Sequence, residues 1–196
     1  MITTIAARRA GTYVLLLELA QPVVLTVGRI GTFDFPAGWY AYVGSALAGI
    51  EQRVARHLRP SPVRHWHIDY LRNVADLRGV WVIYAAERLE CRTAVTLLRL
   101  KHSVGVAPRF GGSDCQCPTH LMYFEGPPDR EIPRQIERVL GVNLAWRDVS
   151  ADGKRPAVCS DVPLGSRAWL PGANPGAGVA NQDRQAGTAG SVSTGR

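Results

Sequence analysis

Arg53 and His57 are a pair of side chains whose types and spacing suggest a reaction. They are four residues apart in a segment where Ile50, Val54 and Leu58 repeat with a helical period. At about 100° per residue, their stripe lies roughly 60° from the apolar stripe, beside the buried face of the helix. A guanidinium can stabilise charge that develops on a phosphate, and an imidazole that titrates near neutrality can move a proton. The types and placement of the two side chains are therefore suited to chemistry on a phosphate ester.

Glu90 is a candidate metal ligand. It falls within the apolar arc of a helix predicted over 87–101, and a carboxylate buried there must be paired or bind a cation. Mg²⁺ or Mn²⁺ is the natural candidate, since one or two carboxylates commonly hold such an ion. Glu87 points to a similar side, but it stands at the predicted helix start, where the helix dipole alone favours an acid. We therefore prefer Glu90 as the ligand, with a buried ion pair to Arg53 as the alternative.

A second candidate metal site lies further along the chain. Cys115, Cys117 and His120 follow the pattern C-x-C-x-x-H, and Cys91 stands elsewhere in the sequence. Cysteine and histidine are good ligands for a structural Zn²⁺. The spacing is not that of a standard zinc finger, however, and Cys91 would have to approach from a separate helix. Packed thiols beside an active-site Asp114 are the alternative that we prefer.

The balance of charge favours a polyanionic partner. The chain carries 23 Lys and Arg residues against 16 Asp and Glu residues, a formal net charge of +7. Such an excess favours nucleic acid, because neutralising phosphates releases counterions. The candidates for contacts away from the reacting bond are Arg56, Arg59, Arg64 and His67. For Arg56 and Arg59 a solvated basic helix is the alternative.

The elements that must position these side chains are short strands and helices. Strands are predicted over 12–19, 23–27, 38–44, 80–84 and 121–124, and helices over 49–58, 65–72, 87–101 and 133–140. Gln21-Pro22 separates the first two strands, which predicts that they form a β-hairpin. Strands first and helices afterwards predict an α+β fold with an antiparallel central sheet flanked by helices.

Composition divides the chain into a folded part and a tail. We expect a catalytic domain over 1–125, an accessory helical extension over 126–150 and a disordered tail over 151–196, where apolar residues are too sparse to offset the conformational entropy. The N-terminus lacks the apolar segment of a signal peptide, and no run of about 18 apolar residues could span a bilayer. These features predict a cytoplasmic protein with reduced thiols and no membrane partner.

Two glycine and tyrosine motifs flank the opening strands. Gly11-Thr12-Tyr13 comes first and Tyr42-Val43-Gly44 second, Arg53 follows eleven residues after Tyr42, and Glu90 comes later. In these motifs and their order, the chain resembles the GIY-YIG nuclease superfamily over roughly residues 11–124. It is most similar to the small stand-alone branch called Uri-like, related to domains joined to endonuclease III. The segments that suggest this branch are WYAYVGSA (39–46), HWHIDYL (65–71), ERLEC (87–91) and SDCQC (113–117).

The resemblance implies a role for each matched residue. Tyr13 would contact the attacking water, as base or as positioner, and Tyr42 would support the site. Without the resemblance, both tyrosines would be read as core residues. Arg53 would be the catalytic cation and Glu90 the metal ligand, while His57 stands where relatives carry His or Tyr. The division of proton transfer between Tyr13 and His57 stays open.

The implied activity is metal-dependent hydrolysis of phosphodiester bonds by an endonuclease, with DNA favoured over RNA and a role in DNA repair suggested by family association. The structure of the substrate stays open among single strands, branched DNA, damaged DNA and RNA. The alternative is a non-cleaving nucleic-acid-binding module that retains the fold. Two departures bear on the mechanism. Some relatives have a lysine where this chain has Ser45, and many have an asparagine near the end of the domain, a place that Asp114 or His120 could fill.

Overall fold

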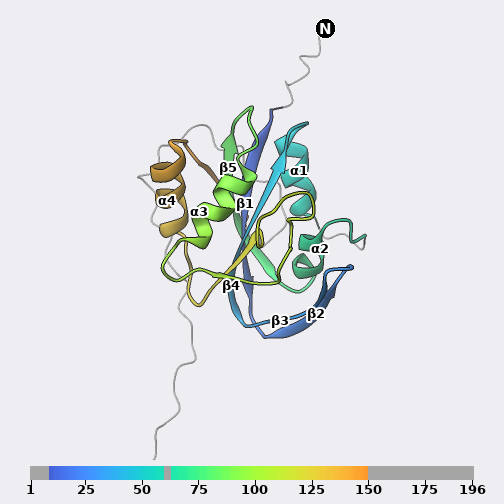
Figure 1. Cartoon of the computed structure of the whole chain (residues 1–196). Helices are drawn as coiled ribbons and strands as arrows, with labels where there is room; N and C mark the ends of the chain where they lie inside the picture. Colours follow the sequence, from blue (N-terminus) through green and yellow to red (C-terminus); the bar gives the residue numbers. More distant parts are fainter. Residues whose placement is uncertain (1–8, 60–62, 150–196) are drawn as a thin grey trace, which may run out of the picture. The chain divides into compact units, whose positions relative to one another are not determined.

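Strand β1 (Gly11–Leu19) is the central element of the fold. It pairs antiparallel with β4 (Gly38–Ala46) on one side and with β5 (Asp76–Tyr84) on the other. The computed structural model describes residues 9–59 and 63–149, and within them six strands form an antiparallel sheet in the order β6-β7-β4-β1-β5-β8. With helices packed against this sheet (Figure 1), the predicted α+β class is confirmed.

The remaining elements complete the sheet or cover it. The other sheet strands are β6 (Val104–Gly105), β7 (Leu121–Phe124) and β8 (Ala145–Asp148), and a separate pair is formed by β2 (Val23–Val27) and β3 (Gly31–Phe35). The helices are α1 (Ile50–His57), α2 (His67–Arg72), α3 (Glu90–Leu98) and α4 (Glu131–Leu140). None of the helices in the described segments has the length and apolar character needed to cross a membrane.

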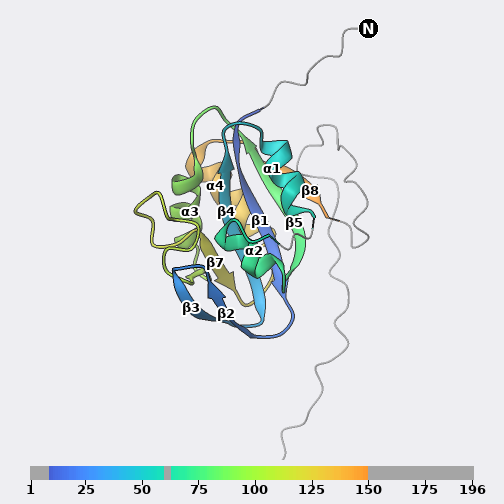
Figure 2. The ribbon, with the colours of Figure 1, turned by 90° about the vertical axis from the view of Figure 1, so that its right-hand side faces the viewer.

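Both faces of the sheet are covered, so β1 is almost continuously buried. Tyr13 and Leu15 contribute to a core on the side of α1 and α2, whereas Val14 and Leu16 contribute to a core on the side of α3 and α4. Figures 1 and 2 show these helix pairs on opposite sides of β1. Because successive strand residues face opposite ways, burial on both faces requires an unbroken apolar run.

The predicted hairpin between the first two strands is wrong. β1 pairs with β4 and β5, whereas β2 pairs with β3 in its own two-stranded sheet beside α2 (Figure 2). The β2–β3 turn begins at Gly28, whose φ of 49° suits a glycine. Phe35 at the end of β3 is buried in the core. The β2–β3 excursion therefore separates two partner strands, β1 and β4, that lie far apart in the sequence.

Helix α3 begins at Glu90, three residues later than predicted. Leu89, the residue immediately before it, has a non-helical backbone and is buried in the core beneath α3 and α4. Glu90 thus stands in the first helical turn, where the dipole stabilises an acid. The sequence argument that placed Glu87 at the helix start, and gave the dipole effect to Glu87 alone, is wrong. Glu87 precedes the helix, is exposed and lies 3.7 Å from Arg92.

Residues 126–149 belong to the same folded unit as the sheet. Ile132 and Ile136 of α4 are fully buried in the core that includes Leu97 of α3. Strand β8 adds to the edge of β5, where the ring centroids of Trp146 and Trp81 lie 4.6 Å apart. The segment that we predicted as an accessory extension therefore completes the domain. The predicted tail, 151–196, lies outside the described residues.

Replacing Ile136 by Ala tests whether α4 is part of this core. The buried side chain leaves a cavity when truncated, so the free energy of unfolding should fall by about 2–5 kcal/mol in urea denaturation. Val139 on the same helix is 47% exposed, and Val139→Ala is the matched control with a loss within about 0.5 kcal/mol. Equal losses for the two variants would contradict this packing.

Candidate active site

A pocket of about 300 Å³ brings together most of the side chains singled out in the sequence. Tyr13, Tyr42, Arg53, His67 and Glu90 all line it, although they come from β1, β4, α1, α2 and α3. Its remaining lining residues, all of which except Gly111 lie in the motifs quoted from the sequence, are Gly44, Ser45, His65, Trp66, Arg88, Gly111, Ser113 and Asp114.

The two glycine and tyrosine motifs meet through strand pairing. Tyr13 of β1 is directly opposite Gly44 of β4. A Cβ atom at Gly44 would collide with the ring and hydroxyl of Tyr13, and a Cβ at Gly11 would collide with the carbonyl of Ile83 and the side chain of Ile50. Gly44 therefore leaves the space that the Tyr13 phenol occupies, and Gly11 allows β1 to pack closely against β5 and α1.

Tyr13 and His57 form one hydrogen-bonded unit. The hydroxyl of Tyr13 lies 2.8 Å from Nε2 of His57. Burial lowers the pKa of His57 to about 4, so the imidazole is neutral near pH 7. Burial also raises the pKa of Tyr13, an effect that Arg53 opposes. Tyr13 lines the pocket and His57 does not, so the phenol separates the imidazole from the pocket.

Arg53 faces the pocket from α1 above an indole ring. Its guanidinium carbon lies 4.2 Å from the ring centroid of Trp66, and that of Arg56 lies 3.7 Å from the same ring. Arg56 also forms an ion pair of 3.0 Å with Asp69, which accepts hydrogen bonds from the backbone amides of His65 and Trp66. Burial opposes ionisation of Asp69, but these hydrogen bonds hold its pKa below the usual value. Asp69 therefore fixes the segment that carries Trp66.

Glu90 is buried and held through both carboxylate oxygens. Oε2 accepts a 2.6 Å hydrogen bond from the Ser45 hydroxyl and lies 3.7 Å from Nε of Arg88. Oε1 lies 3.2 Å from Nδ1 of His120. Among the ion pairs of residues 9–59 and 63–149, Arg53 is not a partner of Glu90, so the buried pair considered as an alternative is absent there.

Asp114 enters the same pocket from the loop before β7. Its carboxylate lies 3.2 Å from Arg88, so this arginine stands between Asp114 and Glu90. The sequence named Asp114 as a candidate, whereas Arg88 was missed. The available signal was its position two residues before Glu90 in the motif ERLEC.

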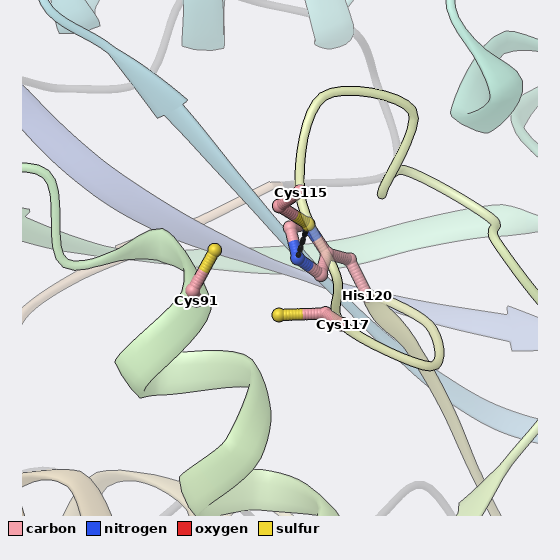
Figure 3. A group of neighbouring side chains, drawn as sticks. All are labelled: Cys91, Cys115, Cys117 and His120. Carbon is pink, nitrogen blue, oxygen red and sulfur yellow. Dashed lines mark hydrogen bonds between the residues drawn. The ribbon is translucent and has the colours of Figure 1, made fainter.

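Three cysteines, Cys91, Cys115 and Cys117, form a cluster with His120 (Figure 3), which we call the Cys3His cluster. Its His120 contacts Glu90, which lines the pocket. Cys91 comes from α3, and Cys115, Cys117 and His120 come from the loop that leads into β7. The ligand atoms of all four residues lie within 4.8 Å of one another, so the cluster could bind a metal ion. Cys91 does approach from a separate helix, as a zinc site would require.

The predicted nucleic-acid contacts fall in different environments. Arg59 and Arg64 are exposed, and Arg64 lies 5.0 Å from the ring centroid of Tyr70. Arg56 is already paired within the protein. His67 lines the pocket, where its Nδ1 accepts a 3.0 Å hydrogen bond from the amide of Gly111, and burial lowers its pKa.

The buried His57 predicts a defined pH dependence of stability. Its pKa falls from 6.5 to about 4 on folding. Between these pH values the imidazole is protonated in the unfolded chain and neutral in the folded chain, so acidification favours unfolding. Acidification from pH 7 to pH 4 should cost roughly 3 kcal/mol through this residue. Urea unfolding across this range should show that His57→Gln lacks this cost. An equal pH dependence in both proteins would contradict a buried neutral imidazole.

Comparison with known proteins adds the family. No curated protein and no solved structure matches the chain. Residues 12–140 match a family described as "Domain of unknown function DUF123". The match runs from β1 to the end of α4 and contains every residue that lines the pocket or forms the Cys3His cluster. With about two thirds of its length matched, the chain belongs to the family of domain of unknown function DUF123.

Proposed function

We propose that this protein is a metal-dependent endonuclease that hydrolyses phosphodiester bonds in DNA. The observation that carries the proposal is a pocket-facing arginine without an acidic partner. Within residues 9–59 and 63–149, Arg53 forms no ion pair, although Asp69 and Glu90 nearby are both paired with other groups. A cation left in this state at a pocket wall is suited to bind a phosphate.

The chain's own residues supply a consistent set of roles. Arg53 would stabilise the negative charge that develops on the phosphate. Tyr13 would meet the attacking water, because its phenol borders the pocket. His57 would hold that phenol from behind and exchange a proton through it. Tyr42 lies on β4, where it pairs with Leu15 of β1. It would support the site by packing beside Tyr13, whose ring centroid is 6.5 Å from its own.

Glu90 is the residue that we propose to hold Mg²⁺ or Mn²⁺. Its Oε2 lies on the side of Ser45 and Arg88, which both line the pocket, and Asp114 provides a second carboxylate there. One or two carboxylates, completed by water and phosphate, suit Mg²⁺. The bound ion would polarise the phosphate. The preference for Glu90 over Glu87 now depends on burial and access to the pocket, because Glu87 is exposed.

The substrate class follows from charge and from the likeness to GIY-YIG nucleases. Arg59 and Arg64 are exposed on the segments that follow α1 and precede α2, and with Arg56 and His67 they would contact the backbone of the nucleic acid. DNA is proposed rather than RNA, with a role in DNA repair, because the branch that the sequence resembles is related to domains joined to endonuclease III. A reducing compartment such as the cytoplasm suits its thiols.

For the Cys3His cluster we propose Zn²⁺. Three sulfurs and one imidazole nitrogen are a donor set typical of structural zinc. In a tetrahedral site with bonds of about 2.0–2.3 Å, the ligand atoms lie roughly 3.5–3.8 Å apart. The four ligand atoms already lie within 4.8 Å of one another, so shifts of about 1 Å would complete the tetrahedron.

Arg53→Ala tests the proposed activity. Purified full-length protein with Mg²⁺ or Mn²⁺ should cleave one or more labelled DNAs in a panel of single-stranded, duplex and branched DNA and RNA. Loss of the guanidinium should slow cleavage by roughly 10²–10³, with a smaller effect on binding. Arg138→Ala is the control, since Arg138 is exposed on α4, across the sheet from α1. A wild-type protein that binds every substrate and cleaves none would favour the non-cleaving module.

Metal analysis tests the zinc site. Protein purified without chelator should contain about one Zn²⁺ per chain, because four ligands saturate a structural site. Cys91→Ser should lose most of this zinc and unfold at a lower temperature. His102→Ala removes an exposed histidine outside the cluster and should retain the metal. Zinc-free wild-type protein that binds no added Zn²⁺ would exclude the assignment.

A further inference from the structure

The two ring nitrogens of His120 face two different groups of side chains. Nε2 lies 3.4 Å from the sulfur of Cys115, within the Cys3His cluster, whereas Nδ1 lies 3.2 Å from Oε1 of Glu90. The ring is buried, with 1% of its surface exposed. Within the described part of the chain, Nδ1 has no hydrogen bond of normal geometry, so its contact with Glu90 is close but not well aligned. A buried nitrogen of this kind is costly unless it acquires a partner.

Metal binding would supply the reason for this arrangement. A histidine that binds a metal through Nε2 carries its proton on Nδ1, and in metal sites that N–H is commonly donated to a carboxylate. Here the carboxylate in reach of Nδ1 is Glu90.

The other oxygen of Glu90 faces the pocket side. Oε2 accepts the hydrogen bond from Ser45 and lies near Arg88, and both of these residues line the pocket. The two oxygens of one carboxylate therefore belong to different sites. Ser45, which stands where some relatives of the resembled superfamily have a lysine, has a definite role as the donor that orients Oε2.

We propose that Glu90 joins the metal of the Cys3His cluster to the pocket, accepting the His120 N–H through Oε1 and presenting Oε2 to the pocket. Glu90 is a positioning residue for the cluster, and zinc in the cluster in turn fixes the carboxylate that faces the substrate. The proposal has two halves. The first, the bond from His120 to Oε1, depends on the zinc assignment alone, and the second, the presentation of Oε2 to the pocket, rests on the proposed nuclease function.

The affinity for Zn²⁺ measures the first half without any activity assay. Glu90→Ala in the full chain should bind Zn²⁺ about 10–100-fold more weakly in competition with a chelator, as expected when the carboxylate behind a metal-bound histidine is lost. Glu90→Gln, which keeps an acceptor oxygen, should recover part of the affinity. Glu87→Ala is the matched control, because Glu87 is exposed in the same segment, and it should bind like wild type. If folded Glu90→Ala binds Zn²⁺ like Glu87→Ala, the link is refuted.

Cleavage measures the second half. The quantity to measure is the Mn²⁺ concentration that gives half-maximal cleavage. It should be lower for zinc-loaded wild type than for zinc-depleted wild type that circular dichroism shows to be folded. Ser45→Ala should raise that concentration while leaving the affinity for Zn²⁺ near wild type. If the half-maximal Mn²⁺ concentration is the same with and without zinc, the proposed effect of zinc on Oε2 of Glu90 is overturned. Absence of cleavage under all conditions would instead refute the nuclease function, and the Zn²⁺ affinities would still decide the Glu90–His120 link.

Discussion

The pairing of β1 with β4 sets Tyr13 opposite Gly44, and the candidate site depends on that register. A slip of one residue would turn Tyr13 towards α3 and α4 and bring its neighbours to the pocket side, because side chains alternate along a strand. Both faces of β1 are buried, so such a slip would also exchange the residues of two cores. Core packing therefore enforces the register on which the phenol's position depends.

Among the described residues, the charges around the pocket are arranged so that Arg53 has no acidic partner. Asp69 is satisfied by Arg56 and two backbone amides, and Glu90 by Ser45, Arg88 and His120. Since buried carboxylates must be paired, these partners are a condition of folding as well as of any activity. Arg53, stacked on Trp66, is held in place without being neutralised. The same interactions that stabilise the acids thus leave the arginine suited to an anionic ligand.

Local periodicity predicted much of the fold, and long-range pairing decided the rest. The strand over 121–124 and the helix around Arg53 were predicted from their patterns because those patterns extend over the whole element. β8 was missed, since its short sequence becomes a strand by pairing with β5 and packing Trp146 over Gly79. The prediction of a β1–β2 hairpin was wrong for a related reason, because the apolar sequence of a strand does not specify which strand it pairs with.

The sequence by itself identified the residues whose types and spacing suggest chemistry: the paired glycine and tyrosine motifs, Arg53 and His57 one helical turn apart, and the C-x-C-x-x-H pattern. These depend on residue type and short spacing, which folding does not change. Tertiary structure alone decided that Cys91 joins the cluster, that Arg88 lies between Asp114 and Glu90, and that Glu90 faces His120 as well as the pocket. Those contacts connect the start of α3 and the residues just before it with the loop that leads into β7. Packing of α3 against the sheet that contains β7 brings them together, which no local pattern records.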